Sequence, residues 1–147
     1  MTDLLIIGYG NTLRRDDGVG PAVADAVAAL ELPGVKSLAC PLLAPELAAD
    51  LADAKSVIFV DAAVDSPREV QLRPLAPADS SQIMAHAADP RTMLALARDV
   101  FGHAPAAWCL TIPVEDLAIG EGFSTLTQNG FEIALREIRR IAAETAG

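Results

Sequence analysis

The amino-acid sequence predicts an α/β domain of three layers, in which a twisted, mostly parallel sheet of about five strands carries helices on both faces. Two observations predict this class. Short apolar runs rich in branched residues alternate along the chain with segments of helical periodicity, and a parallel crossover needs a dozen or more residues, which a helix supplies. A chain of 147 residues without a repeat or linker fits a single domain over residues 1–147.

The first third of the chain alternates strand and helix patterns. Residues 4–7 form an apolar run that predicts a buried strand emptying into a glycine-rich loop. From Val19 the apolar residues recur at helical spacing until a Pro-Gly pair ends the helix. Residues 35–38 predict a second strand, and residues 45–51 predict a short helix.

The middle of the chain contains the clearest strand, at residues 56–60, and Asp61 follows it directly. Residues 70–72 predict a shorter edge strand, because the prolines that bound it cannot donate to a sheet ladder. The segment 74–89 lacks periodicity and predicts a long surface loop, and loops of this length are often functional.

The last third predicts a helix, a strand and a helix. Asp89 is typical of a helix N-cap and Pro90 of the first helical position, so we expect a helix from there to Gly102. Residues 108–112 predict a strand, and residues 124–143 predict a long final helix with an apolar inner face.

Composition and charge restrict the partners. Acidic side chains number 20 against 11 basic ones, and the formal charge of −9 disfavours nucleic acid and anionic lipid surfaces. No stretch reaches the roughly 18 apolar residues of a membrane span, and no export signal is visible. Cys40 and Cys109 lack the spacing of a disulfide framework or a structural zinc site. We expect a soluble, cytoplasmic protein without a nucleic-acid or membrane partner.

Three candidate site residues follow from the rule that function gathers at the carboxyl ends of strands in open α/β sheets. Asp17 lies in the loop after the first strand, Asp61 ends the clearest strand, and His86 lies in the long loop. Two oxygen ligands and one nitrogen suit nickel, zinc or a similar divalent ion. Each residue also has a plainer interpretation: a helix N-cap for Asp17, an acid bound to backbone amides for Asp61, and a packed histidine for His86.

Other chemistries fit the sequence less well. Gly8 and Gly10 follow a strand as in a dinucleotide-binding turn, but Leu13 stands in place of the third glycine. The chain has no Gly-x-Ser-x-Gly motif and no serine or cysteine beside an evident histidine base. We interpret Cys109 as a small buried hydrophobe, and Cys40 as a weak candidate for a thiolate at the metal.

The segment Gly8-Tyr9-Gly10-Asn11-Thr12-Leu13, followed by Asp16-Asp17-Gly18-Val19-Gly20, resembles the signature of the hydrogenase maturation proteases, and Val60-Asp61-Ala62 resembles their second motif. The resemblance extends over nearly the whole chain, and Leu110-Thr111-Ile112-Pro113 is similar to the branch that serves soluble bidirectional hydrogenases. One departure is the segment Ala39-Cys40-Pro41-Leu42-Leu43, which holds no acid where some relatives carry one.

The resemblance implies an endopeptidase that removes the C-terminal extension of the nickel-iron hydrogenase large subunit after nickel insertion. It also implies that Asp17, Asp61 and His86 are the metal-contacting and catalytic residues. The nickel arrives on the precursor, and zinc or cadmium can take its place. Whether water is activated at the metal or by a carboxylate, as in an aspartyl protease, stays open. The alternatives are a non-cleaving, nickel-dependent assembly chaperone of the same subunit and a small dinucleotide-binding module.

Overall fold

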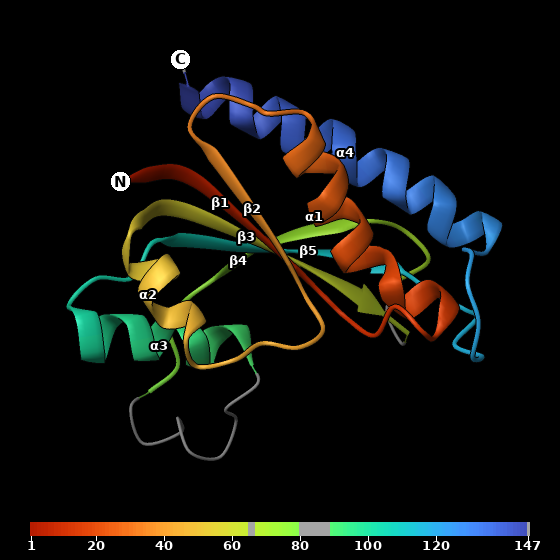
Figure 1. Cartoon of the computed structure of the whole chain (residues 1–147), viewed down its shortest axis with the longest axis horizontal. Coiled ribbons are helices and arrows are strands. Elements are labelled where there is room, and N and C mark those ends of the chain that lie inside the picture. Colours follow the sequence, from red (N-terminus) through yellow and green to blue (C-terminus); the bar gives the residue numbers. More distant parts are fainter. Residues whose placement is uncertain (65–66, 80–88, 147) are drawn as a thin grey trace.

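The computed structural model describes residues 1–64, 67–79 and 89–146, and it forms three layers around one five-stranded sheet (Figure 1). The strand order is β2-β1-β3-β5-β4, in which β4 alone runs antiparallel to its neighbour. The predicted α/β class is therefore confirmed. The elements are β1 (Thr2–Tyr9), the 3-10 helix η1 (Arg15–Gly18), α1 (Val19–Ala29), β2 (Val35–Cys40), α2 (Leu47–Ala52), β3 (Ala54–Ala63), β4 (Gln71–Leu75), α3 (Pro90–Phe101), β5 (Ala106–Pro113) and α4 (Thr125–Ala146).

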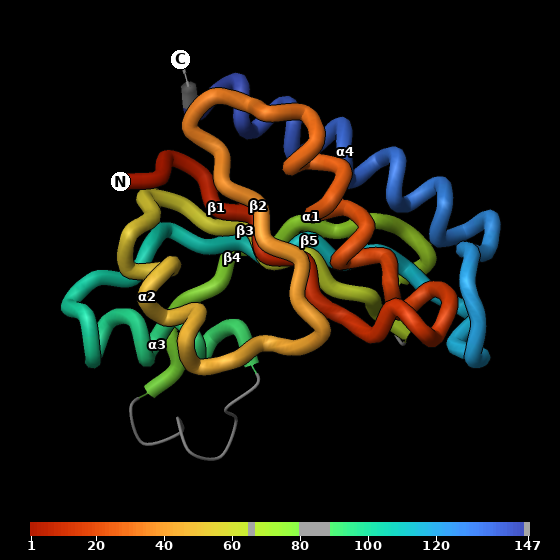
Figure 2. Tube along the Cα trace, viewed as in Figure 1, coloured from red at the N-terminus to blue at the C-terminus, as the bar shows by residue number. Residues whose placement is uncertain are grey.

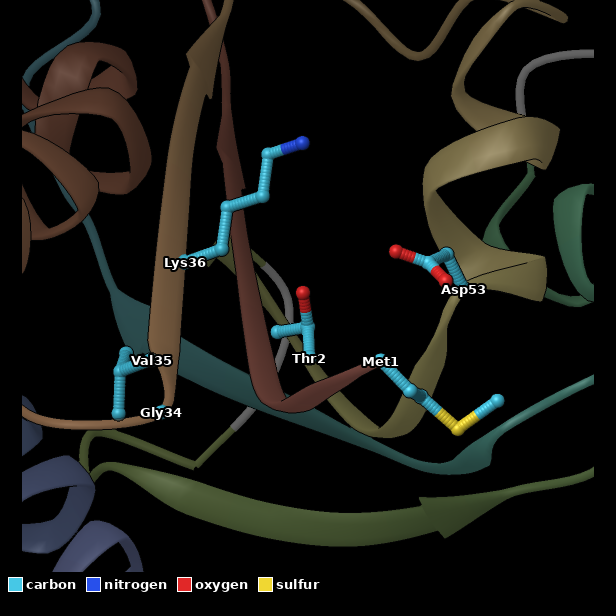
Figure 3. A pocket seen from close by; sticks show the side chains of 6 residues that line it. All are labelled: Met1, Thr2, Gly34, Val35, Lys36 and Asp53. Carbon is cyan, nitrogen blue, oxygen red and sulfur yellow. The ribbon is translucent and has the colours of Figure 1, made fainter.

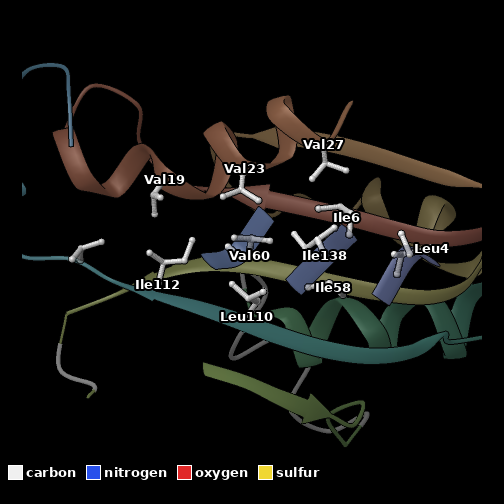
Figure 4. Packing of buried hydrophobic residues seen from close by; sticks show 13 residues of the cluster. Leu4, Ile6, Val19, Val23, Val27, Ile58, Val60, Leu110, Ile112 and Ile138 are labelled. Atoms are coloured by element: carbon white, nitrogen blue, oxygen red, sulfur yellow. The ribbon is translucent and has the colours of Figure 1, made fainter. Parts of the chain in front are cut away.

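The alternation of side chains along the strands divides the core into two parts. Leu4 and Ile6 of β1 pack under α1 and α4, whereas Leu5 and Ile7 pack under α2 and α3, and all four are fully buried. Figure 4 shows the first part, in which the valines of α1 point at the sheet. Each such side chain stabilises the fold by about 1.5–3 kcal/mol. Because both faces of these strands are buried, their sequences are continuous runs of apolar residues.

Helix α3 has the signals that the sequence predicts at both of its ends. The Asp89 side chain caps the helix by accepting a hydrogen bond of 2.8 Å from the backbone N–H of Arg91, with Pro90 at the first helical position. Gly102 ends the helix with a left-handed φ of 81°, which glycine adopts without steric cost. Of the predicted loop at 74–89, residues 74 and 75 belong to β4, and residues 80–88 lie outside the described residues.

Strand β4 is longer than the predicted edge strand at 70–72 because it includes Pro74. Pro74 is aligned with Trp108 of β5. Its missing N–H is tolerated because β4 is an edge strand, so that one side of it has no ladder to complete.

Among the described residues no helix has the length and apolar character needed to span a bilayer.

Gly8 allows α1 to approach the sheet closely. A Cβ atom on Gly8 would lie 2.0 Å from the backbone oxygen of Gly20, and one on Gly20 would lie 2.5 Å from the Tyr9 carbonyl oxygen. We expect Gly8→Ala to lower the free energy of unfolding in urea by about 3 kcal/mol, because backbone must move to admit the methyl group. The control is Gly102→Ala, whose Cβ meets nothing within 4 Å and which should cost about 1 kcal/mol for its backbone conformation. Equal losses in both variants would contradict this explanation.

Candidate active site

The carboxyl ends of β1, β3 and β5 meet at one edge of the sheet, at the right of the view in Figure 2. Gly8 of β1 is aligned with Val60 of β3, and Asp61 is aligned with Thr111 of β5. Tyr9 and Asp61 are the next residues along these two adjacent strands, so they lie side by side. By the alternation of side chains both lie on the face that α2 and α3 cover.

Asp61 is a half-buried acid in an environment that disfavours its charge. Burial raises the pKa of its carboxyl, hydrogen bonds from the Tyr9 hydroxyl and the Ala62 backbone lower it, and the nearby Asp17 charge raises it, so that the pKa is raised overall. Burial and the charge of Asp61 in turn raise the pKa of Tyr9 far above its usual range. Tyr9 therefore remains a hydroxyl donor to Asp61, and a cation placed here would gain from a desolvated carboxylate.

Asp17 lies in η1, close enough to Asp61 for their charges to interact. Its carboxylate oxygen Oδ2 accepts a hydrogen bond of 2.8 Å from the backbone N–H of Asn11. The N-cap residue of α1 is Gly18, without a side-chain cap, so interpreting Asp17 as the cap of α1 is wrong. The carboxylate instead fixes the loop after β1 through this hydrogen bond. Its remaining oxygen lone pairs can accept other partners.

His86, the third predicted site residue, lies outside the described residues. Within residues 1–64, 67–79 and 89–146, no three His, Cys, Asp or Glu side chains form a group that could hold a metal ion. The described part of the predicted set is therefore the carboxylate pair of Asp17 and Asp61. Two hard oxygen ligands fit a divalent ion that brings most of its coordination with it.

The remaining histidine and the two cysteines do not add a described nucleophile. His103 places its ring nitrogen Nε2 3.0 Å from the backbone oxygen of Ala54, at the amino end of β3 and thus away from Asp61. Burial, with the charge of Asp61, raises the pKa of the Cys109 thiol to about 12. Burial and the Asp50 charge raise the pKa of Cys40 as well. Both thiols are therefore disfavoured as thiolates, which makes them poor nucleophiles.

Asp16, which the sequence analysis left without a role, fixes the loops that surround the site. It is fully buried and accepts hydrogen bonds from the backbone N–H groups of Glu115, Asp116 and Ser124 and from the Ser124 hydroxyl, at 2.7–3.0 Å. Burial acts to raise its pKa, but these bonds outweigh burial and lower the pKa to about 2. Asp16 thus ties η1 to the segment between β5 and α4. Its signal in the sequence is the Asp-Asp pair, which does not reveal which acid points inward.

The glycines of the first loop are used for packing. Gly10 has a φ of 151°, and a Cβ atom on it would lie 2.1 Å from the Asp17 carbonyl oxygen. Gly8 likewise packs closely against Gly20, so both glycines bring the backbone close to other backbone atoms of this chain. This use of the glycines does not favour the dinucleotide interpretation.

A separate hollow of about 390 Å³ lies at the amino end of the sheet, away from both carboxylates, and is lined by Met1, Thr2, Gly34, Val35, Lys36 and Asp53 (Figure 3).

No protein-family model and no curated protein sequence matches the chain, but several solved structures do. The hydrogenase maturating endopeptidase HybD from E. coli is 20% identical, with a TM-score of 0.75 and coverage of 97% of this chain and 93% of that chain. The NiFe hydrogenase maturation protease HycI from Thermococcus kodakarensis KOD1 is 22% identical, with the same TM-score and coverage. A hydrogenase 2 maturation peptidase from a Thaumarchaeota archaeon is 20% identical, with a TM-score of 0.66 and coverage of 95% and 97%. The chain has the fold of these hydrogenase maturation endopeptidases.

Proposed function

We propose that this chain is an endopeptidase that removes the C-terminal extension of the nickel-iron hydrogenase large subunit after nickel insertion. The observation that carries the proposal is the carboxylate pair of Asp17 and Asp61 at the carboxyl edge of a fold shared with hydrogenase maturation endopeptidases. The motif resemblance in the loop after β1 and at the end of β3 supports the same activity.

In this proposal nickel belongs to the substrate. The precursor brings the ion bound by its own ligands, and Asp17, Asp61 and His86 occupy its open coordination positions, which places the scissile peptide at the edge of the sheet. Zinc or cadmium fits the same set of ligands. Water attacks the peptide carbonyl, activated either at the ion or by one of the carboxylates. A protein nucleophile is not invoked, because both cysteine thiols are disfavoured as thiolates.

The test is the mass of the large-subunit precursor after incubation with the purified protein. We expect nickel-loaded precursor to lose the mass of its C-terminal extension and nickel-free precursor to remain intact. A stable complex without any loss of mass would instead establish the non-cleaving chaperone. If the precursor is not cleaved and forms no complex with the protein, both functions are refuted.

Tyr9 orients Asp61 in this scheme, and its hydroxyl is the atom to remove. We expect Tyr9→Phe to slow processing of nickel-loaded precursor about tenfold, because a hydrogen bond to a charged group contributes about 1.5–3 kcal/mol. The single-turnover cleavage rate measures the effect, and the melting temperature of the variant shows that the fold is retained. An unchanged rate would exclude Tyr9 from the site.

A further inference from the structure

Strand β2 leaves one edge of the sheet open. It pairs with β1 on one side only, and within the described part of the chain no other strand pairs with it. The backbone N–H of Gly10 donates to the Cys40 carbonyl oxygen at 3.2 Å, so Cys40 directs its backbone toward β1. Because alternate residues of a strand point their polar backbone groups to opposite sides, Ser37 and Ala39 direct theirs outward. In Figure 2 this strand lies in front of the others.

Lys36 does not cover this edge, although lysine commonly protects edge strands. Its ammonium group forms an ion pair of 2.8 Å with Asp50 of α2, which draws the side chain back over the helix. As far as the described residues extend, the outward donors and acceptors of Ser37 and Ala39 are therefore available to an extended chain.

A hollow adjoins the carboxyl end of β2 on each face of the sheet. The hollow on the α1 side measures about 210 Å³ and is lined by Gly10, Thr12, Pro21, Asp25, Ala39, Cys40 and Pro41. The hollow on the α2 side measures about 350 Å³ and is lined by Ala39, Cys40, Pro41, Leu42, Ala44, Glu46 and Leu47. Successive side chains of an added strand point to opposite faces, so neighbouring residues would enter the two hollows.

The charges of the hollows indicate the chemistry of the occupant. Asp25 in one hollow and Glu46 in the other are exposed acids that no basic side chain of the described residues pairs with. The second hollow is otherwise mostly apolar. Lysine or arginine side chains, with an apolar side chain in the α2-side hollow, complement this lining.

We propose that β2 binds an extended, basic and apolar segment of the large-subunit precursor by β-strand addition, which delivers the scissile peptide to the carboxylate pair. This inference rests on the proposed function. Backbone hydrogen bonds supply affinity in such complexes, and side-chain hollows supply selectivity. An added strand lies three strand spacings, about 14 Å, from β3. About four extended residues therefore connect it to Asp61.

Ala39→Pro tests the strand addition, because proline removes the outward N–H and obstructs the edge. It leaves the ladder to β1 intact, since the N–H of Ala39 does not point to β1. We expect KM for cleavage of nickel-loaded precursor to rise at least tenfold with kcat changed less than twofold. The matched control is Leu72→Pro on β4, the opposite edge strand, where Pro74 already occupies an outward position; its KM should stay within twofold. Equal KM values for both proline variants would overturn the proposal.

Amide hydrogen exchange separates this inference from the proposed function and does not depend on the folding of a variant. Adding nickel-loaded precursor to the wild-type protein should slow exchange at Ser37 and Ala39 at least tenfold, and unchanged exchange there would overturn strand addition. If the wild-type protein cleaves nothing, the proposed function fails, and the same exchange measurement still decides whether the precursor docks on β2.

Discussion

Replacing Asp61 with asparagine is expected to abolish processing of the nickel-loaded precursor, with a rate at least about 10³-fold below that of the wild-type protein. The amide keeps the shape of the side chain but removes the negative charge that meets the metal or activates water. Asp17→Asn should have the same effect for the same reason, and His86→Ala should have it because alanine removes the proposed nitrogen ligand. The measurement is the mass of the precursor over time.

Asp53→Asn is the matched control for these variants. Asp53 is an exposed acid just before β3, at the other end of the strand from Asp61. It should leave processing unchanged, and all variants should retain the melting temperature of the wild-type protein within a few degrees. Cleavage at the wild-type rate by Asp61→Asn or Asp17→Asn would refute the proposed site.

Replacing Asp16 with alanine is expected to lower the free energy of unfolding by about 4 kcal/mol or more. Three backbone N–H groups and one hydroxyl lose their acceptor, and each buried donor left without a partner costs about 1–3 kcal/mol. A loss of this size is a large fraction of the stability of a domain, which is about 5–15 kcal/mol. Urea denaturation followed by circular dichroism measures it.

Asp53→Ala provides the comparison for Asp16→Ala. It removes an exposed carboxylate for which the described residues show no hydrogen bond, so its effect should stay within about 0.5 kcal/mol. A loss below 1 kcal/mol in Asp16→Ala would show that the loops after β1 and β5 are held together by other contacts.

The sequence was sufficient for most of the fold. The apolar run at residues 4–7 predicted a strand buried on both faces, because a parallel strand covered by two helical layers leaves no polar side chain among its central residues. Helix α3 was predicted with its ends, because Asp89, Pro90 and Gly102 each perform a local task in the backbone. The predicted length of β4 was wrong, because whether a strand tolerates a proline depends on which of its sides has a neighbouring strand.

The candidate site was predicted less completely. Asp17 and Asp61 were chosen because they follow strands, and the structure places them within reach of each other's charge. Their roles, and that of His86, stay predictions. Tyr9 was missed as a partner of Asp61, because the register between β1 and β3 brings them together. Asp16 was missed because a pair of adjacent acids in a loop gives no periodicity that would show which one is buried.

By itself, the sequence determined the α/β class, the order of strands and helices along the chain and the acids near the carboxyl ends of strands, since these depend on local periodicity and on chemistry within a few residues. Only the tertiary structure decided that Asp61 is desolvated beside Tyr9 and that Asp16 binds a segment about 100 residues further along. It also decided that, among the described residues, no second strand pairs with β2, which lies between two hollows. These properties depend on contacts between distant segments. The order of the strands within the sheet and their register set such contacts, and no single segment of the sequence determines either of them.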